Sequence, residues 1–242
     1  MGRGKETCPF PYLKEESLKE IEFELAEGKI VKLQYEDNCQ TSTQNVFDGE
    51  YDVDISFTGG PVILDIGANI GAFTIWALKR FNPSDIYCYE PLKRHFNLLQ
   101  QNIKSLPETP TKITLINKAI EAPSNKLYLG KKSTASSSFY NLQGQLEEYE
   151  EVENMSAKEL PECSLLKVDT EGCEINIITK YLYTHNRPVL ILFEFHREED
   201  RVELDKLLTS FNYKLCGGFV FGVGLGVFKY VTPSAIRMVY VE

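Results

Sequence analysis

The 242-residue sequence contains no apolar run that approaches the roughly 20 residues needed to cross a membrane. Its amino-terminal segment, MGRGKETCPFPY, also lacks the apolar core of a secretion signal. Basic residues are in deficit, with 26 Lys and Arg against 35 Asp and Glu and a net charge of -9. This balance opposes attraction to nucleic acid or to an anionic membrane surface. We therefore expect a cytoplasmic protein that binds neither nucleic acid nor membranes.

Paired metal ligands are also missing. The six cysteines show no CxxC pair, and the three histidines, His95, His185 and His196, are far apart in the sequence. A structural zinc site needs ligands at close spacing, so none is expected, and free thiols are expected instead of disulfides. Hydrophobic residues make up 43% of the chain, enough for one good core. We expect an appendage over residues 1–55 and one catalytic domain over residues 56–242.

The most informative feature that is present is the run VILDIGANIGAFTIWAL, residues 62 to 78. It is typical of a buried parallel strand, a glycine-bracketed turn and an apolar helix. Gly67 permits a tight turn, Asn69 tolerates a left-handed backbone, and Gly71 lets the helix approach the strand. The amides at the beginning of that helix would point at a bound small molecule.

The charges around this turn favour one class of cofactor. A dinucleotide needs a second glycine where Asn69 stands, and Asp65 would repel its pyrophosphate. A ligand with an ammonium, a sulfonium and a carboxylate fits better, because Asp65 attracts the cations while Asn69 and the helix amides can receive the carboxylate. Glu90, at the end of the next predicted strand, can accept both ribose hydroxyls. S-adenosylmethionine has these features; an NAD-dependent oxidoreductase and a loop that binds nothing stay as alternatives.

Acidic residues recur at the ends of predicted strands. Asp65, Glu90, Asp169 and Glu194 each follow an apolar run. Because parallel strands present their carboxyl ends at the same edge of a sheet, where ligands bind, we predict that these side chains form one site. Asp169, Glu171 and Glu174 also crowd three carboxylates within six residues, and the structural alternative for this group is that Lys167 compensates their charge.

Periodicity outside this region predicts the other elements of a doubly wound fold. Residues 36 to 61, which contain FDGEYD, are either a surface loop or a substrate lid. The predicted elements are a β-hairpin over residues 21–35, a helix over 92–103, a strand in the run 112–120 that ends near Asn117, a helix near 202–211, and a glycine-rich closing hairpin completed by Arg237 to Val241.

The segments DIGANIG, YEP, LLKVDTEGCEI and FEFH together resemble the FkbM-type methyltransferases, over roughly residues 47 to 200. The chain departs from the family pattern at Thr170 and Cys173, which are both small. The resemblance implies an α/β fold: a Rossmann-like class I methyltransferase three-layer sandwich, with a mostly parallel seven-stranded sheet and an antiparallel closing hairpin, here preceded by the N-terminal β-hairpin. It also implies methyl transfer from S-adenosylmethionine to a hydroxyl oxygen of a sugar, lipid or natural product.

The same resemblance implies the site residues. Asp169, Glu171 and Glu174 match its acidic motif. We expect Asp169 to orient the acceptor or take its proton, with His196 as the competing base and Glu171 as a further catalytic candidate. The residues expected to hold the cofactor are Asp65, Gly67, Ala68, Asn69, Gly71, Glu90, Pro91, Asn117, Ala119 and Asp169.

Several features of the acceptor side stay open at this point. No metal site is assigned, although a divalent ion held by Asp169, Glu194 and His196 is conceivable. N-methylation is disfavoured because DTEG stands where amino-directed nucleic-acid enzymes usually carry an NPPY-like tetrad, and a cofactor-binding scaffold without activity is a further alternative. The aromatic residues that could line a pocket for a sugar, lipid or aromatic metabolite are Phe47, Tyr51, Phe139, Tyr140 and Phe219.

Overall fold

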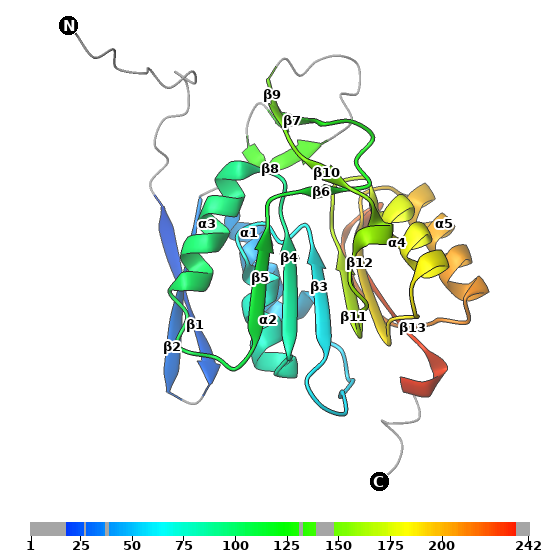
Figure 1. Cartoon of the computed structure of the whole chain (residues 1–242), viewed down its shortest axis with the longest axis horizontal. Helices are drawn as coiled ribbons and strands as arrows, with labels where there is room; N and C mark the ends of the chain where they lie inside the picture. The colour runs from blue at the N-terminus through cyan, green and yellow to red at the C-terminus, as the bar shows by residue number, and fades with distance from the viewer. Residues whose placement is uncertain (1–17, 27, 37–38, 131–132, 139–147, 236–242) are drawn as a thin grey trace, which may run out of the picture.

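The computed structural model describes residues 18–26, 28–36, 39–130, 133–138 and 148–235 (Figure 1). Its centre is a seven-stranded sheet in the order β13-β14-β12-β11-β3-β4-β5. Neighbouring strands from β12 to β5 are parallel, whereas β13 and β14 form an antiparallel hairpin at one edge. The strands are β3 (Val62–Ile66), β4 (Asp85–Tyr89), β5 (Lys112–Ile116), β11 (Leu165–Val168), β12 (Leu190–Phe195), β13 (Lys214–Gly222) and β14 (Leu225–Val231). The predicted Rossmann-like class I fold is confirmed.

Helices cover both faces of the sheet. Alternate residues of a strand point to opposite faces, and β11 shows this directly, because Leu165 joins one buried cluster while Leu166 and Val168 join the other. The first cluster holds helices α2 (Ala72–Phe81) and α3 (Lys93–Lys104), and the second holds α4 (Glu174–Thr184) and α5 (Glu198–Ser210) (Figure 1). None of the helices in the described residues is long and apolar enough to span a membrane.

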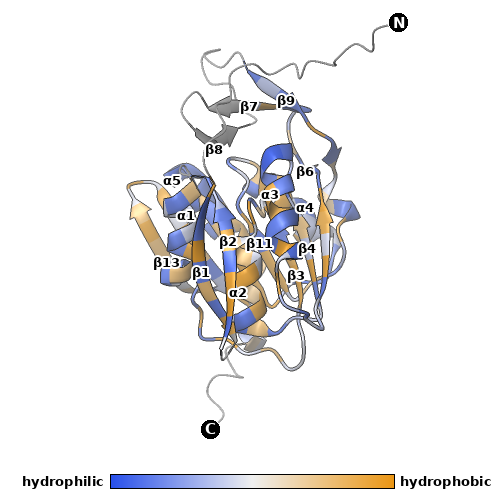
Figure 2. Cartoon of the chain, turned by 90° about the vertical axis from the view of Figure 1, so that its left-hand side faces the viewer, coloured by the Kyte–Doolittle hydropathy of each residue, from blue (hydrophilic) through white to orange (hydrophobic). Residues whose placement is uncertain are grey.

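The N-terminal hairpin pairs β1 (Lys19–Ala26) with β2 (Lys29–Tyr35) in antiparallel register, as predicted. Figure 2, seen from this side, shows the hairpin lying across α2. The side chain of Asn102 on α3 donates to the carbonyl of Gln34 at 3.0 Å and accepts from its amide at 2.8 Å, which ties β2 to α3. The division between residues 1–55 and 56–242 stays a prediction.

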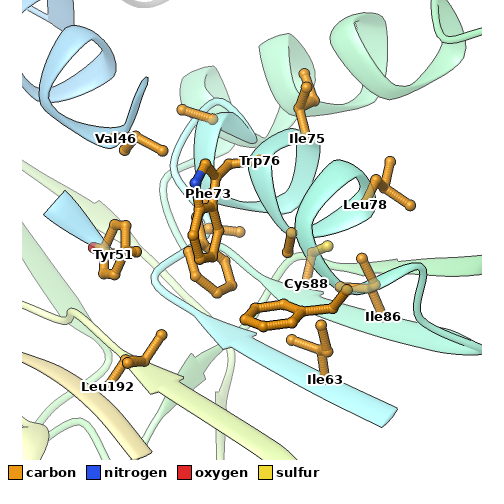
Figure 3. Packing of buried hydrophobic residues seen from close by; sticks show 14 of the residues in the cluster. Val46, Tyr51, Ile63, Phe73, Ile75, Trp76, Leu78, Ile86, Cys88 and Leu192 are labelled. Atoms are coloured by element: carbon orange, nitrogen blue, oxygen red, sulfur yellow. The ribbon is translucent and has the colours of Figure 1, made fainter. Parts of the chain in front are cut away.

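Residues 40–50 form α1 (Gln40–Asn45) and the single-turn helix η2 (Val46–Glu50). Figure 3 shows that Val46 and Tyr51 from this segment lie against α2. The Tyr51 ring packs edge-on against Phe73, with centroids 4.9 Å apart and planes at 74°. Because such aromatic packing fixes both position and orientation, the segment has a defined place beside the carboxyl ends of the strands.

The chain between β5 and β11 forms small strands above the carboxyl edge of the sheet (Figure 1). The strand predicted from residue 112 to near Asn117 is confirmed as β5, which ends at Ile116, and Ala119 and Ile120 pair with a different segment. The small elements are β6 (Ala119–Ile120) with β10 (Asn154–Met155), β7 (Lys126–Gly130) with β8 (Ser133–Ser138) and β9 (Tyr149–Glu151), and the 3-10 turn η4 (Ala157–Glu159). The predicted contributions of Phe139, Tyr140 and Arg237 to Val241 lie outside the described residues.

Candidate functional site

Two adjoining cavities open at the carboxyl ends of β3, β4, β11 and β12. The first, which we call the Glu90 cavity, extends from Glu90 to Ala119 beneath β6. The second, which we call the Glu50 cavity, lies between the segment of α1 and η2 and the β13–β14 hairpin. The two cavities share lining residues, including Gly67, Asn69 and Asp169. They are therefore two parts of one crevice.

The backbone of the turn after β3 contacts the ends of both neighbouring strands, β4 and β11. Gly67 has φ of 79°, and a Cβ there would lie 1.6 Å from the carbonyl oxygen of Asp169. The amides of Gly67 and Ala68 both donate to the carbonyl of Tyr89 at 2.9 Å. Glycine is therefore required for close approach as well as for backbone conformation.

Gly71 has a different role from the predicted one. It caps α2 with φ of 95°, and its missing Cβ would lie 2.8 Å from Cδ1 of Leu99. This glycine therefore makes room for α3, whereas the sequence had assigned it to the contact between α2 and the strand. Asn69, with φ of 50°, adopts the predicted left-handed conformation.

Glu90 is held at the end of β4 by two backbone amides. Its carboxylate accepts from the amide of Asn69 at 2.8 Å and from the amide of Leu92 at 2.9 Å. The Asn117 side chain donates to the carbonyls of Glu90 and Pro91, which orients this turn. Burial raises the pKa of Glu90 to about 7, against the two amides that favour the charged form. Each carboxylate oxygen keeps a lone pair that can accept from a ligand hydroxyl.

A buried ion pair lies below the floor of the crevice. Asp65 is 0% exposed and is in register with Lys167 on β11, whose ammonium lies 3.2 Å from its carboxylate. The ammonium also donates to the carbonyl of Gly67 at 2.6 Å and lies 3.6 Å from Asp169. Desolvation lowers the pKa of Lys167, but the two carboxylates outweigh it and raise the pKa overall. Thr74 completes the pair by donating to Asp65 at 2.7 Å.

The outer wall of the crevice carries acidic groups and one histidine. His196 Nε2 lies 3.2 Å from Glu171 and 3.7 Å from Glu194. Burial raises the pKa of Glu171 to about 7, and burial followed by repulsion from Asp169 raises that of Glu194. Asp169, Glu194 and His196 each place one ligand atom within 4.8 Å of the others, so this group has the spacing of a cation site, and we assign no ion to it.

Glu174 shapes the turn that carries these acids. Its carboxylate accepts from the amides of Thr170 at 2.9 Å and Gly172 at 3.1 Å. The intervening Glu171 has φ of 55°, a conformation that needs such support in a non-glycine residue. The most specific motif of the sequence thus contains one residue that builds the turn and two, Asp169 and Glu171, that line the crevice.

A profile of the methyltransferase FkbM domain matches residues 65–215, more than half of the chain. The chain belongs to the FkbM methyltransferase family. Its members are S-adenosylmethionine-dependent methyltransferases, so the cofactor predicted from the sequence is confirmed at the level of the family. A search of curated protein sequences found no match.

Solved structures agree with this fold. An FkbM methyltransferase from Methylobacillus flagellatus superposes with a TM-score of 0.51 at 14% identity, over 71% of this chain and 44% of that one. A tRNA m1G37 methyltransferase from M. jannaschii superposes with a TM-score of 0.52 at 12% identity, over 90% of this chain and 58% of that one. At these identities the likeness shows the fold alone, and this FkbM-family chain spans about half the length of each.

Most residues predicted to hold the cofactor of this methyltransferase lie around the crevice. The structure places Gly67, Asn69, Glu90, Pro91, Ala119, Asp169 and Glu171 around the Glu90 cavity, and Ala68 beside the Glu50 cavity. The side chain of Asp65, by contrast, is turned toward Lys167. The backbone of Gly71 begins α2, and the side chain of Asn117 holds the turn after β4. His196 lines neither cavity itself, and it contacts the crevice through Glu171 and Glu194.

Sequence reasoning missed several lining residues of this methyltransferase, among them two titratable groups. His95, which had no predicted role, lines the Glu90 cavity, and its burial lowers its pKa to about 4, so the imidazole is neutral. Glu50 lines the second cavity from the FDGEYD segment, where only the aromatic residues had been considered. Of these, Tyr51 lines the same cavity, whereas Phe47 stacks on Phe23 at 4.3 Å.

Proposed function

We propose that this protein transfers the methyl group of S-adenosylmethionine to a hydroxyl oxygen of a small-molecule or glycan acceptor. The observation that carries the proposal is the continuity of the two cavities through Gly67, Asn69 and Asp169. A donor in the Glu90 cavity and an acceptor in the Glu50 cavity would meet beside Asp169. Alignment of this kind supplies much of the catalysis in a methyl transfer, because the bound cofactor supplies a methyl group that is already electrophilic.

The residues of the Glu90 cavity fit the donor. The Glu90 carboxylate can accept from ribose hydroxyls. Among the described residues, the buried Oδ1 of Asn69 has no hydrogen-bond partner, and an ammonium group would satisfy it. Ala119, Ile120 and Leu127 add apolar surface for an adenine ring. We infer that Asp65 acts on the donor indirectly, by holding the Lys167 ammonium.

The residues of the Glu50 cavity fit an uncharged acceptor. Tyr51, Phe219 and Phe221 supply aromatic surface, while carboxylates of the crevice can accept from hydroxyl groups. Asp169 lies where the two cavities join, and we assign to it the orientation of the acceptor hydroxyl. His196 and Glu171 support Asp169 from the outer wall. The same carboxylates and the net charge of -9 oppose a polyanionic acceptor such as nucleic acid.

We also propose that the protein acts in the cytoplasm. The support is that the cysteines within the described residues are free thiols, as expected in a reducing compartment.

A transfer assay with tritiated S-adenosylmethionine tests the function. The acceptors are methyl glycosides, hydroxylated lipids, catechols, primary amines and tRNA, assayed in parallel with Asp169→Asn and with the control Asp85→Asn at the opposite end of the sheet. We expect label in a hydroxyl acceptor, a large loss of turnover in Asp169→Asn and none in the control. Label in amines or tRNA would contradict the proposal, and donor binding without any transfer would support a scaffold instead.

A further inference from the structure

We propose that Glu50 is the carboxylate that receives the proton of the acceptor hydroxyl during methyl transfer. This assignment rests on the proposed function. It gives the two carboxylates different roles, because Asp169 orients the hydroxyl and Glu50 removes its proton. Glu50 lies outside residues 65–215, which the family profile matches, so the profile match assigns it no role.

The backbone around Glu50 is fixed on both sides. Gly49 has φ of 100°, a left-handed conformation that turns the chain at the end of η2. On the other side of Glu50, Tyr51 is buried against Phe73, and the carbonyl of Asp52 accepts from the ammonium of Lys229 on β14. Contacts with α2 and with the closing hairpin therefore place Glu50 between two elements that are distant in the sequence.

The position of Glu50 differs from that of the other carboxylates of the site. Glu50 is only 4% exposed and lines the Glu50 cavity together with Asp169 and Glu194. By contrast, Glu90 and Glu174 accept from backbone amides, and Asp65 is paired with a lysine below the floor. Glu50 thus reaches the acceptor side from η2, none of whose residues lines the Glu90 cavity.

The charged surroundings of Glu50 suit a proton acceptor at neutral pH. Burial, followed by repulsion from Asp169, raises the pKa of Glu50 to about 7, while Lys167, Tyr51 and Lys229 lower it. Glu194 on β12 is a further acidic group that acts on it. A base works best when its pKa lies near the operating pH, because it can then both accept and release the proton.

The step balances without a further reactant. The acceptor oxygen forms a bond to the methyl carbon as the carbon–sulfur bond breaks, and the electron pair of that bond stays on sulfur, which becomes a neutral thioether. The hydroxyl proton moves to the Glu50 carboxylate, which becomes a neutral carboxylic acid. Release of this proton to water restores the site.

Three variants of the full-length protein test the assignment: Glu50→Gln, Glu50→Asp and the matched control Asp54→Asn, which removes an exposed carboxylate four residues further along. Each is assayed with tritiated S-adenosylmethionine and the hydroxyl acceptors described above, from pH 5.5 to 9. Binding of S-adenosylhomocysteine is measured by calorimetry, and folding by thermal melting.

We expect Glu50→Gln to lower kcat by about 100-fold or more, to leave the affinity for S-adenosylhomocysteine within twofold, and to abolish the rise of kcat through neutral pH. Glu50→Asp should recover part of the rate, and Asp54→Asn should match the wild type. A kcat within threefold of wild type in Glu50→Gln would overturn the assignment and leave the methyl transfer intact. Loss of donor binding or an unchanged pH profile in that variant would overturn it in favour of a structural role. A wild-type protein that transfers no label at all would refute the proposed function itself.

Discussion

The Glu90 cavity and the Glu50 cavity share strand ends but are built in different ways. The first is formed largely by backbone that β3 and β4 hold rigidly, with Gly67 against the carbonyl of Asp169 and Glu90 on two amides. The second is closed by side chains from residues 41–51 and 219–225. The first segment precedes the parallel strands in the sequence, and the second follows them. We infer that the parallel strands fix the donor, while residues 41–51 and 219–225 select the acceptor. Substitutions should therefore change donor binding and acceptor binding independently.

The largest expected effect comes from Lys167, which lies beneath both cavities and should not separate them. Lys167→Met leaves the buried Asp65 without its charge partner, and we expect the free energy of unfolding to fall by about 3–5 kcal/mol. Urea denaturation measures the change. The control Lys32→Met removes an exposed ion pair with Glu20 and should leave the free energy of unfolding nearly unchanged. Equal losses in the two variants would contradict the role given to Lys167.

Gly67→Ala should disable the donor side. The added Cβ would overlap the Asp169 carbonyl, so the turn must shift, and misplacement of reacting groups by about 1 Å can cost about 100-fold in rate. We expect turnover to fall by about that factor and calorimetry to show weaker binding of S-adenosylhomocysteine. Gly222→Ala is the control, because a Cβ there meets nothing within 4 Å. Retained affinity in Gly67→Ala would show that the donor does not use this turn.

Phe221→Ala should affect only the acceptor side. Loss of one aromatic face should raise KM for the acceptor by about tenfold, equivalent to about 1.4 kcal/mol, with donor affinity unchanged. Leu215→Ala, an exposed position on the same strand, is the control. A parallel drop in donor affinity would mean that the two cavities are not functionally separate.

The smallest expected effect is a pH dependence of stability shared by both cavities. Burial raises the pKa of Glu90 to about 7 from an ordinary value of 4.5, so the folded protein binds more protons than the unfolded chain between these values. The free energy of unfolding should therefore rise as the pH falls from about 8 to about 6. His95, whose pKa is lowered to about 4, opposes this gain only below its ordinary value of 6.5.

Glu90→Gln removes the contribution of this carboxylate. As the pH falls from about 8 to about 6, we expect the free energy of unfolding of the variant to rise less than that of the wild type, by on the order of 1 kcal/mol. Urea titrations of wild type and variant at several pH values give the two slopes. If the free energy of unfolding depended on pH with the same slope in both proteins, the burial of the Glu90 carboxylate would not raise its pKa.

The sequence predicted the sheet and the donor side because both depend on local patterns. The apolar strands, the Gly67 turn and the acidic strand ends are short motifs, and parallel strands bring their ends together whatever their exact register. The pairing of Asp65 with Lys167 depends on the register of β3 against β11, and the sequence did not predict it. The ion pair now accounts for why Asp65 is turned away from the crevice.

Tertiary packing decided what sequence patterns could not. Residues 36 to 61 have no clear periodicity, and Glu50 is positioned by the packing of Tyr51 on Phe73 and by the contact of Asp52 with Lys229. The sequence predicted that the strand in the run 112–120 ends near Asn117, but it did not predict that Ala119 and Ile120 pair with Asn154 and Met155. Such pairings join segments more than thirty residues apart, which periodicity alone does not connect.

A crystal structure of the protein with S-adenosylhomocysteine tests the central claim most directly. The account predicts that the ribose hydroxyls contact the Glu90 carboxylate, that the amino group lies within hydrogen-bond reach of Asn69 Oδ1, and that the sulfur points toward the Glu50 cavity. A ligand bound elsewhere, or one that leaves Glu90 and Asn69 without contact, would contradict it.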